Sequence, residues 1–229
     1  MKNTVQIGRR NLRMFNSREM IELFFEEKFK IFKSIEYALI QKLYEELIQV
    51  YINDGIVFTM GNGGGTSVAN GFAVDLRTHP FTHEDKSVTT EVRRIRVIDL
   101  SESSGMITGI ANDIGPESIY SEQLKNWFRE DSVAQKNLMI AFSGSGNSKN
   151  IVNAIEMAKK YGVTTSCVSG RGGGAASKLV DIPIIVPGNS NFPGQTGKND
   201  NNFHIEELQV SVGHILTGLL KGYVNQKGL

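Results

Sequence analysis

Between Ser17 and Asn53, apolar residues recur every three or four positions, and the stretch contains no glycine or proline. This spacing places them on one face of a helix. Ser17 is a suitable N-cap residue and Asp54-Gly55 a suitable end, but one long helix and two helices broken near Lys33-Ser34 fit the pattern equally. The apolar face is longer than one small sheet covers, so we expect part of it to contact another subunit. It consists of Phe25, Phe29, Phe32, Ile35, Leu39, Leu43 and Leu47.

From Ile56 onward, short apolar runs alternate with stretches of helical spacing. Such alternation predicts an α/β fold with a doubly wound, five-stranded parallel sheet, preceded by residues 1–54 as a helical extension. Ligands bind such sheets at the carboxyl ends of the strands. Residues 187–202, rich in Gly, Asn and Pro, form a loop long enough to act as a lid. The predicted strands span residues 56–60, 95–100, 138–142, 163–168 and 182–186, and the predicted helices 66–76, 105–111, 117–128, 148–161, 175–179 and 202–224.

Composition narrows the possible functions. The 229 residues are 40% hydrophobic and carry a formal net charge of +1, which suits one packed domain and provides no basic surface for nucleic acid. No stretch approaches the roughly 20 apolar residues that span a bilayer, and the first residues lack the apolar segment of a signal peptide. The single cysteine, Cys167, lies in a predicted strand and cannot form an intrachain disulfide. We therefore expect a cytoplasmic protein without nucleic-acid or membrane partners.

The first candidate binding loop is Gly61-Asn62-Gly63-Gly64-Gly65-Thr66, directly after a predicted strand and before a predicted helix. Glycines let the backbone approach a ligand closely, and the following helix N-terminus offers N–H groups to an anion. The lysine of a nucleotide-binding P-loop is missing, and the spacing does not match a dinucleotide fold. A glycine-rich turn without any ligand is the alternative interpretation.

The second candidate loop is Ser143-Gly144-Ser145-Gly146-Asn147-Ser148, again between a strand and a helix. Hydroxyl groups and backbone amides at a helix N-terminus form a phosphate cradle that needs no fixed positive charge. A simple N-cap role accounts for Ser148 but not for the two further serines that alternate with glycines. The loop therefore predicts a phosphate site.

These two loops, Asn112-Asp113-Ile114-Gly115 and the closing segment 205–214 resemble, in order and spacing, the SIS (sugar isomerase) family and within it the phosphoheptose isomerases. The resemblance implies a flavodoxin-like three-layer sandwich over residues 55–229 that binds a phosphosugar. From the long apolar stripe we expect a homo-oligomer, a tetramer, assembled through residues 1–54. The implied substrate contacts are Asn62, Gly63, Gly64, Asp75, Asn112, Asp113, Ser143, Gly144, Ser145, Ser148 and Glu206.

The resemblance also implies the chemistry. Asp75 and His214 match the family's catalytic acid and histidine, and Glu206 stands at a glutamine position. These relatives commonly bind zinc, for which Asp75, Glu206 and His214 are the candidate ligands here, but the position of the first ligand is Gly71. We therefore expect at most a weakly bound divalent metal.

Each of these residues also has a structural interpretation. His214 lies among apolar residues and suits a helix interior, Glu206 suits a solvated helix start, and Asp75 is placed to pair with Arg77. The remaining histidines, His79, His83 and His204, are predicted to lie outside the pocket, the first two on the surface.

The predicted activity is an intramolecular oxidoreduction that converts sedoheptulose 7-phosphate to a manno-heptose 7-phosphate through an enediol. Two alternatives remain open at this stage. One is a non-catalytic sugar-phosphate sensor or partner-binding protein, which the loss of a ligand side chain at Gly71 favours. The other is the same chemistry on a pentose or hexose phosphate, because one fold hosts several functions.

Overall fold

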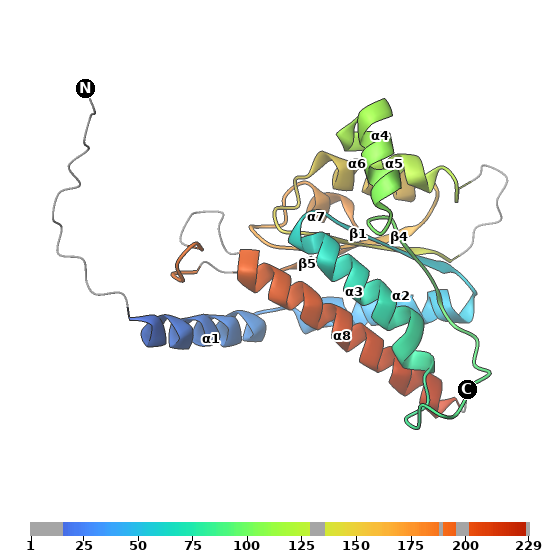
Figure 1. Cartoon of the computed structure of the whole chain (residues 1–229), viewed down its shortest axis with the longest axis horizontal. Helices are drawn as coiled ribbons and strands as arrows, with labels where there is room; N and C mark the ends of the chain where they lie inside the picture. The colour runs from blue at the N-terminus through green and yellow to red at the C-terminus, as the bar shows by residue number, and fades with distance from the viewer. Residues whose placement is uncertain (1–15, 129–135, 188–189, 196–201, 228–229) are drawn as a thin grey trace.

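A parallel sheet of five strands forms the centre of the molecule (Figure 1). The computed structural model describes residues 16–128, 136–187, 190–195 and 202–227. The strand order is β2-β1-β3-β4-β5 and every pairing is parallel, so the predicted doubly wound sheet is confirmed. The strands are β1 (Ile56–Gly61), β2 (Arg96–Asp99), β3 (Leu138–Ser143), β4 (Thr164–Ser169) and β5 (Ile182–Ile185).

Helices cover both faces of the sheet, which makes three layers (Figure 1). Because side chains alternate along a strand, Leu138, Ile140 and Phe142 of β3 pack with one helix layer, while Met139 and Ala141 pack with the other. The first layer contains α2 (Tyr37–Ile52), α3 (Gly64–Thr78) and α8 (Asn202–Gln226), and the second contains α4 (Ser104–Asp113), α5 (Ile119–Leu124), α6 (Lys149–Lys160) and α7 (Ala176–Leu179).

The N-terminal stripe forms two helices, α1 (Ser17–Lys33) and α2. The cap of α1 is Asn16, not Ser17 as predicted, because the Asn16 side chain accepts hydrogen bonds from the amides of Arg18 and Glu19 at 3.1 and 3.3 Å. α2 packs into the core, where Leu43 and Leu47 are completely buried. α1 instead projects from the body of the molecule (Figure 1).

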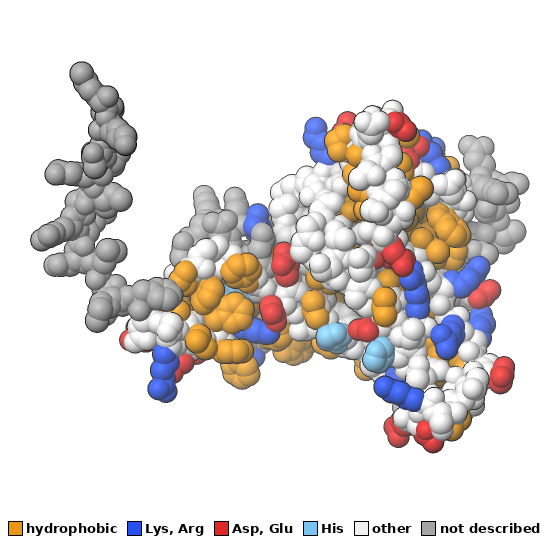
Figure 2. Space-filling model, viewed as in Figure 1, with side chains coloured by type: hydrophobic (Ala, Val, Ile, Leu, Met, Phe, Trp, Pro, Cys, Tyr) orange, Lys and Arg blue, Asp and Glu red, His pale blue; other side chains and the backbone are white. Residues whose placement is uncertain are grey.

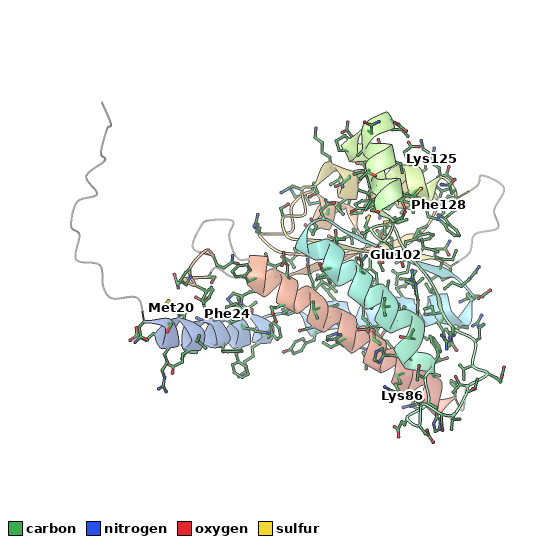
Figure 3. The ribbon with its side chains drawn as sticks, viewed as in Figure 1. Met20, Phe24, Lys86, Glu102, Lys125 and Phe128 are labelled. Atoms are coloured by element: carbon green, nitrogen blue, oxygen red, sulfur yellow. The ribbon has the colours of Figure 1, made fainter. Side chains whose placement is uncertain are left out.

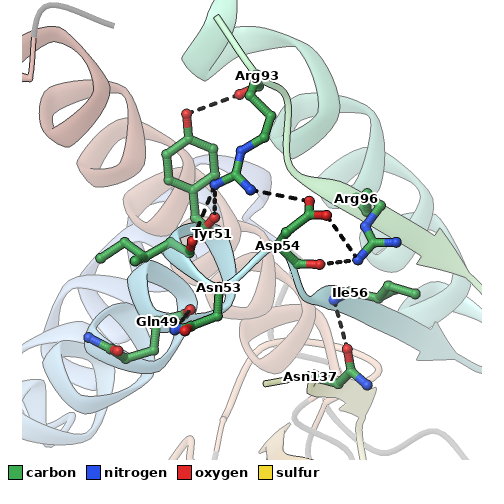
Figure 4. A network of polar contacts seen from close by, with 9 residues as sticks. Gln49, Tyr51, Asn53, Asp54, Ile56, Arg93, Arg96 and Asn137 are labelled. Carbon is green, nitrogen blue, oxygen red and sulfur yellow. Dashed lines mark hydrogen bonds and ion pairs between the residues drawn. The ribbon is translucent and has the colours of Figure 1, made fainter. Parts of the chain in front are cut away.

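Asp54 ties the end of α2 to the sheet (Figure 4). It adopts a left-handed conformation, with φ of 53°, and its carboxylate lies 3.3 Å from Arg93 and 3.5 Å from Arg96. The side chains of both arginines are about half exposed, and both take part in this link. Next to it, the amide of Ile56 donates to the Asn137 side chain at 2.8 Å and fixes the start of β1.

The structure bears on three further predictions, which concern the helix at residues 117–128, Cys167 and the lid at residues 187–202. The predicted helix 117–128 is wrong in extent, because a short 3₁₀ turn at Pro116–Ser118 precedes α5, which ends at Leu124. Cys167 lies in β4, as predicted, and it is completely buried, which raises the pKa of its thiol to about 12. Part of the expected lid lies outside the described residues. In the described part of the chain, no helix is both long enough and apolar enough to cross a bilayer.

Candidate active site

The two candidate loops lie side by side at one end of the sheet. β1 and β3 are neighbours, with Gly61 of β1 in register with Phe142 of β3. The strand order changes direction between these two strands, which is where doubly wound sheets bind ligands. Residues 61–66 (the glycine loop) and residues 143–148 (the phosphate loop) therefore form adjacent walls of one candidate site.

The glycine loop needs its glycines for two different reasons. Gly63 has φ of 56° and ψ of −123°, a conformation that is nearly restricted to glycine. At Gly65 an added Cβ would lie only 2.7 Å from the carbonyl oxygen of Phe142. The loop thus brings the start of α3 against β3, and α3 begins without a side-chain cap, as a helix N-terminus that faces an anionic ligand does.

The phosphate loop presents hydroxyl groups whose protons remain available. Ser143 Oγ accepts a hydrogen bond from the amide of Gly146 at 3.0 Å, and Ser145 Oγ accepts one from the amide of Asn147 at 3.2 Å. Both hydroxyls use a lone pair in these contacts, so their protons can be donated to a phosphate oxygen. Ser148 is the N-cap residue of α6, but its side chain forms no capping hydrogen bond. The geometry therefore suits the predicted phosphate site.

A third segment, residues 170–176, packs against the phosphate loop, and the sequence analysis missed it. The amide of Ala176 donates to the Gly146 carbonyl at 2.9 Å, and the amide of Ala175 donates to Asn147 Oδ1 at 3.0 Å. The approach is so close that a Cβ at Gly146 would lie 1.9 Å from the carbonyl oxygen of Gly173. The run of three glycines after a predicted strand was the available indication of this contact.

Asp75 and His214, the predicted catalytic residues, meet where α3 packs against α8. His214 Nε2 lies 3.6 Å from Asp75 Oδ2, and His79 Nε2 lies 3.4 Å from Asp75 Oδ1. The His214 side chain is 67% exposed in the single chain, so its interpretation as an interior histidine is wrong. Arg77 pairs with Glu102 at 3.0 Å and not with Asp75. Figure 2 shows histidine and acidic side chains together on this face of α3 and α8.

Glu206 lies at the glycine loop, away from that pair. Its carboxylate occupies the space beside Gly64, where a Cβ would come within 2.2 Å of Oε1. Burial raises the pKa of the Glu206 carboxyl, so a fully solvated helix start does not describe it. Eight residues of α8 separate Glu206 from His214, which corresponds to about 12 Å along the helix.

Asn112 and Asp113, the remaining predicted contacts, end α4. Both are exposed, and Asn112 Nδ2 donates to Asp113 Oδ1 at 2.8 Å. In the described part of the chain, neither forms a hydrogen bond or ion pair with the glycine loop or the phosphate loop. Their role as substrate contacts stays a prediction.

The predicted metal ligands do not form a site within one chain. Gly71 has no side chain, and Glu206 is about 12 Å from His214 along α8. Within the described ranges, no three His, Cys, Asp or Glu side chains are grouped closely enough to hold a metal ion. The residues present therefore do not fit the zinc site expected from the resemblance.

Comparison with known proteins agrees with these features. The model of the SIS domain matches residues 24–170. The chain belongs to the SIS domain family. A phosphoheptose isomerase from Helicobacter pylori strain P12 is 31% identical over 198 residues, which cover 86% of this chain and 90% of that relative. A phosphoheptose isomerase from Helicobacter hepaticus is 32% identical over 190 residues, 82% of this chain and 84% of the relative. At this identity and coverage, the chain is in one family with these relatives.

Solved structures show the same fold. A phosphoheptose isomerase from Francisella tularensis superposes with a TM-score of 0.73 at 22% identity, covering 91% of this chain and 100% of that one. The SIS arrangement of sheet and helices is therefore shared over almost the entire chain.

Proposed function

We propose that this protein is an intramolecular oxidoreductase that converts sedoheptulose 7-phosphate to a manno-heptose 7-phosphate. The observation that carries the proposal is the uncharged phosphate loop beside the glycine loop at the turning point of the strand order. A site of this kind anchors a phosphosugar through hydroxyl and amide donors. The membership of the chain in one family with phosphoheptose isomerases supports the seven-carbon substrate.

Asp75 and His214 act as the acid–base pair that carries out the proton transfers. Asp75 removes a proton from C1 of the ketose while His214 donates a proton to the oxygen on C2, which gives the enediol. Return of a proton to C2 and loss of the proton on O1 then yield the aldose. Both proton transfers use only side chains of this protein, and its candidate metal ligands, Asp75, Glu206 and His214, do not meet within one chain.

The distances within one chain support the proposal that the site is shared between two copies. Asp75 is eleven residues beyond Gly64, about 16 Å along α3. An extended heptose phosphate reaches only about 10 Å from its phosphorus to C1, at the advance per bond of an extended chain. We infer that a sugar anchored on the phosphate loop of one chain meets the acid–base pair of a neighbouring chain, in a homo-oligomer that we expect to be a tetramer.

The exposed apolar surface supports this assembly. On α1, Ile21, Phe25 and Phe29 are 57–65% exposed, and Figure 2 shows apolar side chains gathered over this helix. In addition, an apolar hollow of about 480 Å³ lies between α2 and α8. It is lined by Tyr37, Ile40, Gln41, Tyr44, Glu45, Ile215 and Leu219. The division into an oligomerisation region, residues 1–54, and a phosphosugar-binding domain, residues 55–229, stays a proposal, as does a cytoplasmic location.

An assay over ketose phosphates of five, six and seven carbons, with and without a chelator, tests the proposed function. We expect turnover of sedoheptulose 7-phosphate that persists in the chelator. Turnover of only a pentose or hexose phosphate would change the substrate, and binding of the heptose phosphate without any turnover would establish the sensor alternative.

A further inference from the structure

The side-chain amide of Asn62, in the glycine loop, is held by two residues outside the predicted site. Asn62 Nδ2 donates to Asn150 Oδ1 at 2.8 Å, and Asn150 Nδ2 donates back to Asn62 Oδ1 at 2.9 Å. The hydroxyl of Tyr120 lies 3.1 Å from the same Asn62 oxygen. The two amide–amide hydrogen bonds, with the Tyr120 hydroxyl beside them, therefore define the orientation of an exposed side chain that would otherwise rotate freely.

Tyr120 is a buried donor on α5. It is only 2% exposed, and burial raises the pKa of its phenol, so the hydroxyl keeps its proton at neutral pH. It also lies 2.5 Å from the carbonyl oxygen of Gly61, the last residue of β1. The one proton of the phenol therefore faces two acceptors at the start of the glycine loop, the Gly61 carbonyl at the shorter distance and Asn62 Oδ1 at the longer one.

Asn150 connects the two loops to each other. It lies in the first turn of α6, immediately after the phosphate loop. Because its partner Asn62 belongs to the glycine loop, the reciprocal amide pair sets the spacing between the two walls of the candidate site. Positions this close to a phosphate anchor decide where the reacting carbons lie, and displacement of about 1 Å is enough to lower a rate markedly.

We propose that Asn150 and Tyr120 are positioning residues that fix the Asn62 amide against the bound sugar. Asn62 Oδ1 accepts from Asn150 and lies beside the Tyr120 hydroxyl, and Asn62 Nδ2 has a second hydrogen available for the ligand. Asn62 therefore acts toward the ligand as a donor, which suits a hydroxyl or carbonyl oxygen of the sugar. The proposal rests on the proposed function only in naming that ligand as sedoheptulose 7-phosphate.

A double-mutant cycle separates this role from a general structural one. Asn62→Ala and Asn150→Ala should each lower kcat/KM roughly five- to tenfold, the effect of one lost hydrogen bond. The double variant should lose no more than Asn62→Ala alone, because Asn150 acts through Asn62. Tyr120→Phe, which keeps the buried ring, should also lower kcat/KM, and part of its loss should persist in the Asn62→Ala background because the phenol also bonds the Gly61 carbonyl. Losses that multiply in the double variant of Asn62→Ala and Asn150→Ala would overturn the proposal.

The control is Asn153→Ala on the same helix, whose side chain donates to the Glu117 carbonyl at 3.0 Å and should leave kcat/KM unchanged. Calorimetry provides a second readout. Affinity for sedoheptulose 7-phosphate should fall in each single variant and should fall no further in the double variant. Affinity for inorganic phosphate should stay constant, and an equal fall in both affinities would contradict the positioning role. If the parent protein bound the heptose phosphate without turning it over, the isomerase proposal would be wrong. The double-mutant cycle measured in binding affinity would still test the positioning role.

Discussion

His214 on α8 meets Asp75 on α3 with 3.6 Å between Nε2 and Oδ2. The neighbour of His214 in the chain, Gly213, makes this meeting possible. A Cβ at Gly213 would lie 3.1 Å from the ring of Phe72, so the absence of a side chain lets the two helices approach closely at this point. The acid–base pair is thus a product of helix packing, one turn from a tight contact between α3 and α8.

Substitution of either member of the pair tests its proposed role. Asp75→Asn and His214→Ala should each lower turnover of sedoheptulose 7-phosphate by about 10²–10⁴-fold, the usual contribution of a positioned acid or base. Affinity for inorganic phosphate should persist, because the phosphate loop is unchanged. Steady-state kinetics and calorimetry measure the two effects, with the exposed Glu84→Gln as control. Parental turnover in both variants would exclude the mechanism.

A mixing experiment tests whether the site is shared between chains. Asp75→Asn protein, defective in chemistry, is unfolded and refolded together with Ser145→Ala protein, defective in binding. In mixed oligomers some sites combine two intact halves, so activity should exceed the sum of the separate variants. No gain over that sum, in oligomers shown to be mixed, would place the complete site within one chain.

Removal of one hydroxyl group from the phosphate loop should weaken the binding of a sugar phosphate. Ser145 accepts from the amide of Asn147 and has its proton free for a phosphate oxygen. Ser145→Ala should weaken sugar-phosphate binding by about 1–3 kcal/mol, the value of a hydrogen bond to a charged group. Isothermal calorimetry measures the change, and Ser34→Ala at the end of α1 is the control. Equal affinity of variant and parent would mean that the loop does not bind the phosphate.

The sequence predicted the strands and both loops because their signals are local. The uninterrupted apolar run at residues 138–142 and the alternating serines and glycines after it need no tertiary information. The contact of His79 with Asp75 was missed because the predicted helix ended at residue 76. In the structure α3 continues to Thr78, and a 3₁₀ turn follows, which brings His79 one turn beyond Asp75. The pairing of Asn62 with Asn150 depends on the register of β1 against β3, which no local pattern contains.

Glu27 anchors α1 to the body of the molecule. Its carboxylate accepts from Ser190 Oγ at 2.6 Å and from the amide of Asn191 at 2.7 Å, and it lies 3.1 Å from Nε2 of the completely buried His204. Phe24 also lies on α1 (Figure 3), and its ring packs against the His204 ring. Burial acts to raise the pKa of Glu27, but the hydrogen bonds outweigh it and leave that pKa below its ordinary value of 4.5.

Glu27→Ala should therefore lower the free energy of unfolding at pH 7 by about 1–3 kcal/mol. Because the folded-state pKa is lowered, the stabilisation is present above pH 4.5 and is lost as the pH falls through the folded value. The difference between parent and variant should shrink below pH 4.5, as measured by urea unfolding across a pH series. The exposed neighbour Glu26→Ala is the control. A difference that grows toward acid pH would contradict this assignment.

Gly71 gives the last prediction, which concerns metal binding. A Cβ at Gly71 would have no atom within 4 Å, so a side chain fits there in the single chain. In Gly71→His, the imidazole would lie one turn before Asp75 on the same face of α3, the spacing of a two-residue metal site. Zinc should bind this variant at least about tenfold more tightly than the parent, since even outer-shell partners of a ligand change metal affinity by that factor. Competition with a chromophoric chelator measures both affinities, and Gly109→His, equally open but on α4, controls for an added histidine. If the parent already bound zinc as tightly as the variant, Gly71 would not be the reason for a missing site, and metal-assisted isomerisation would have to be considered for this chain.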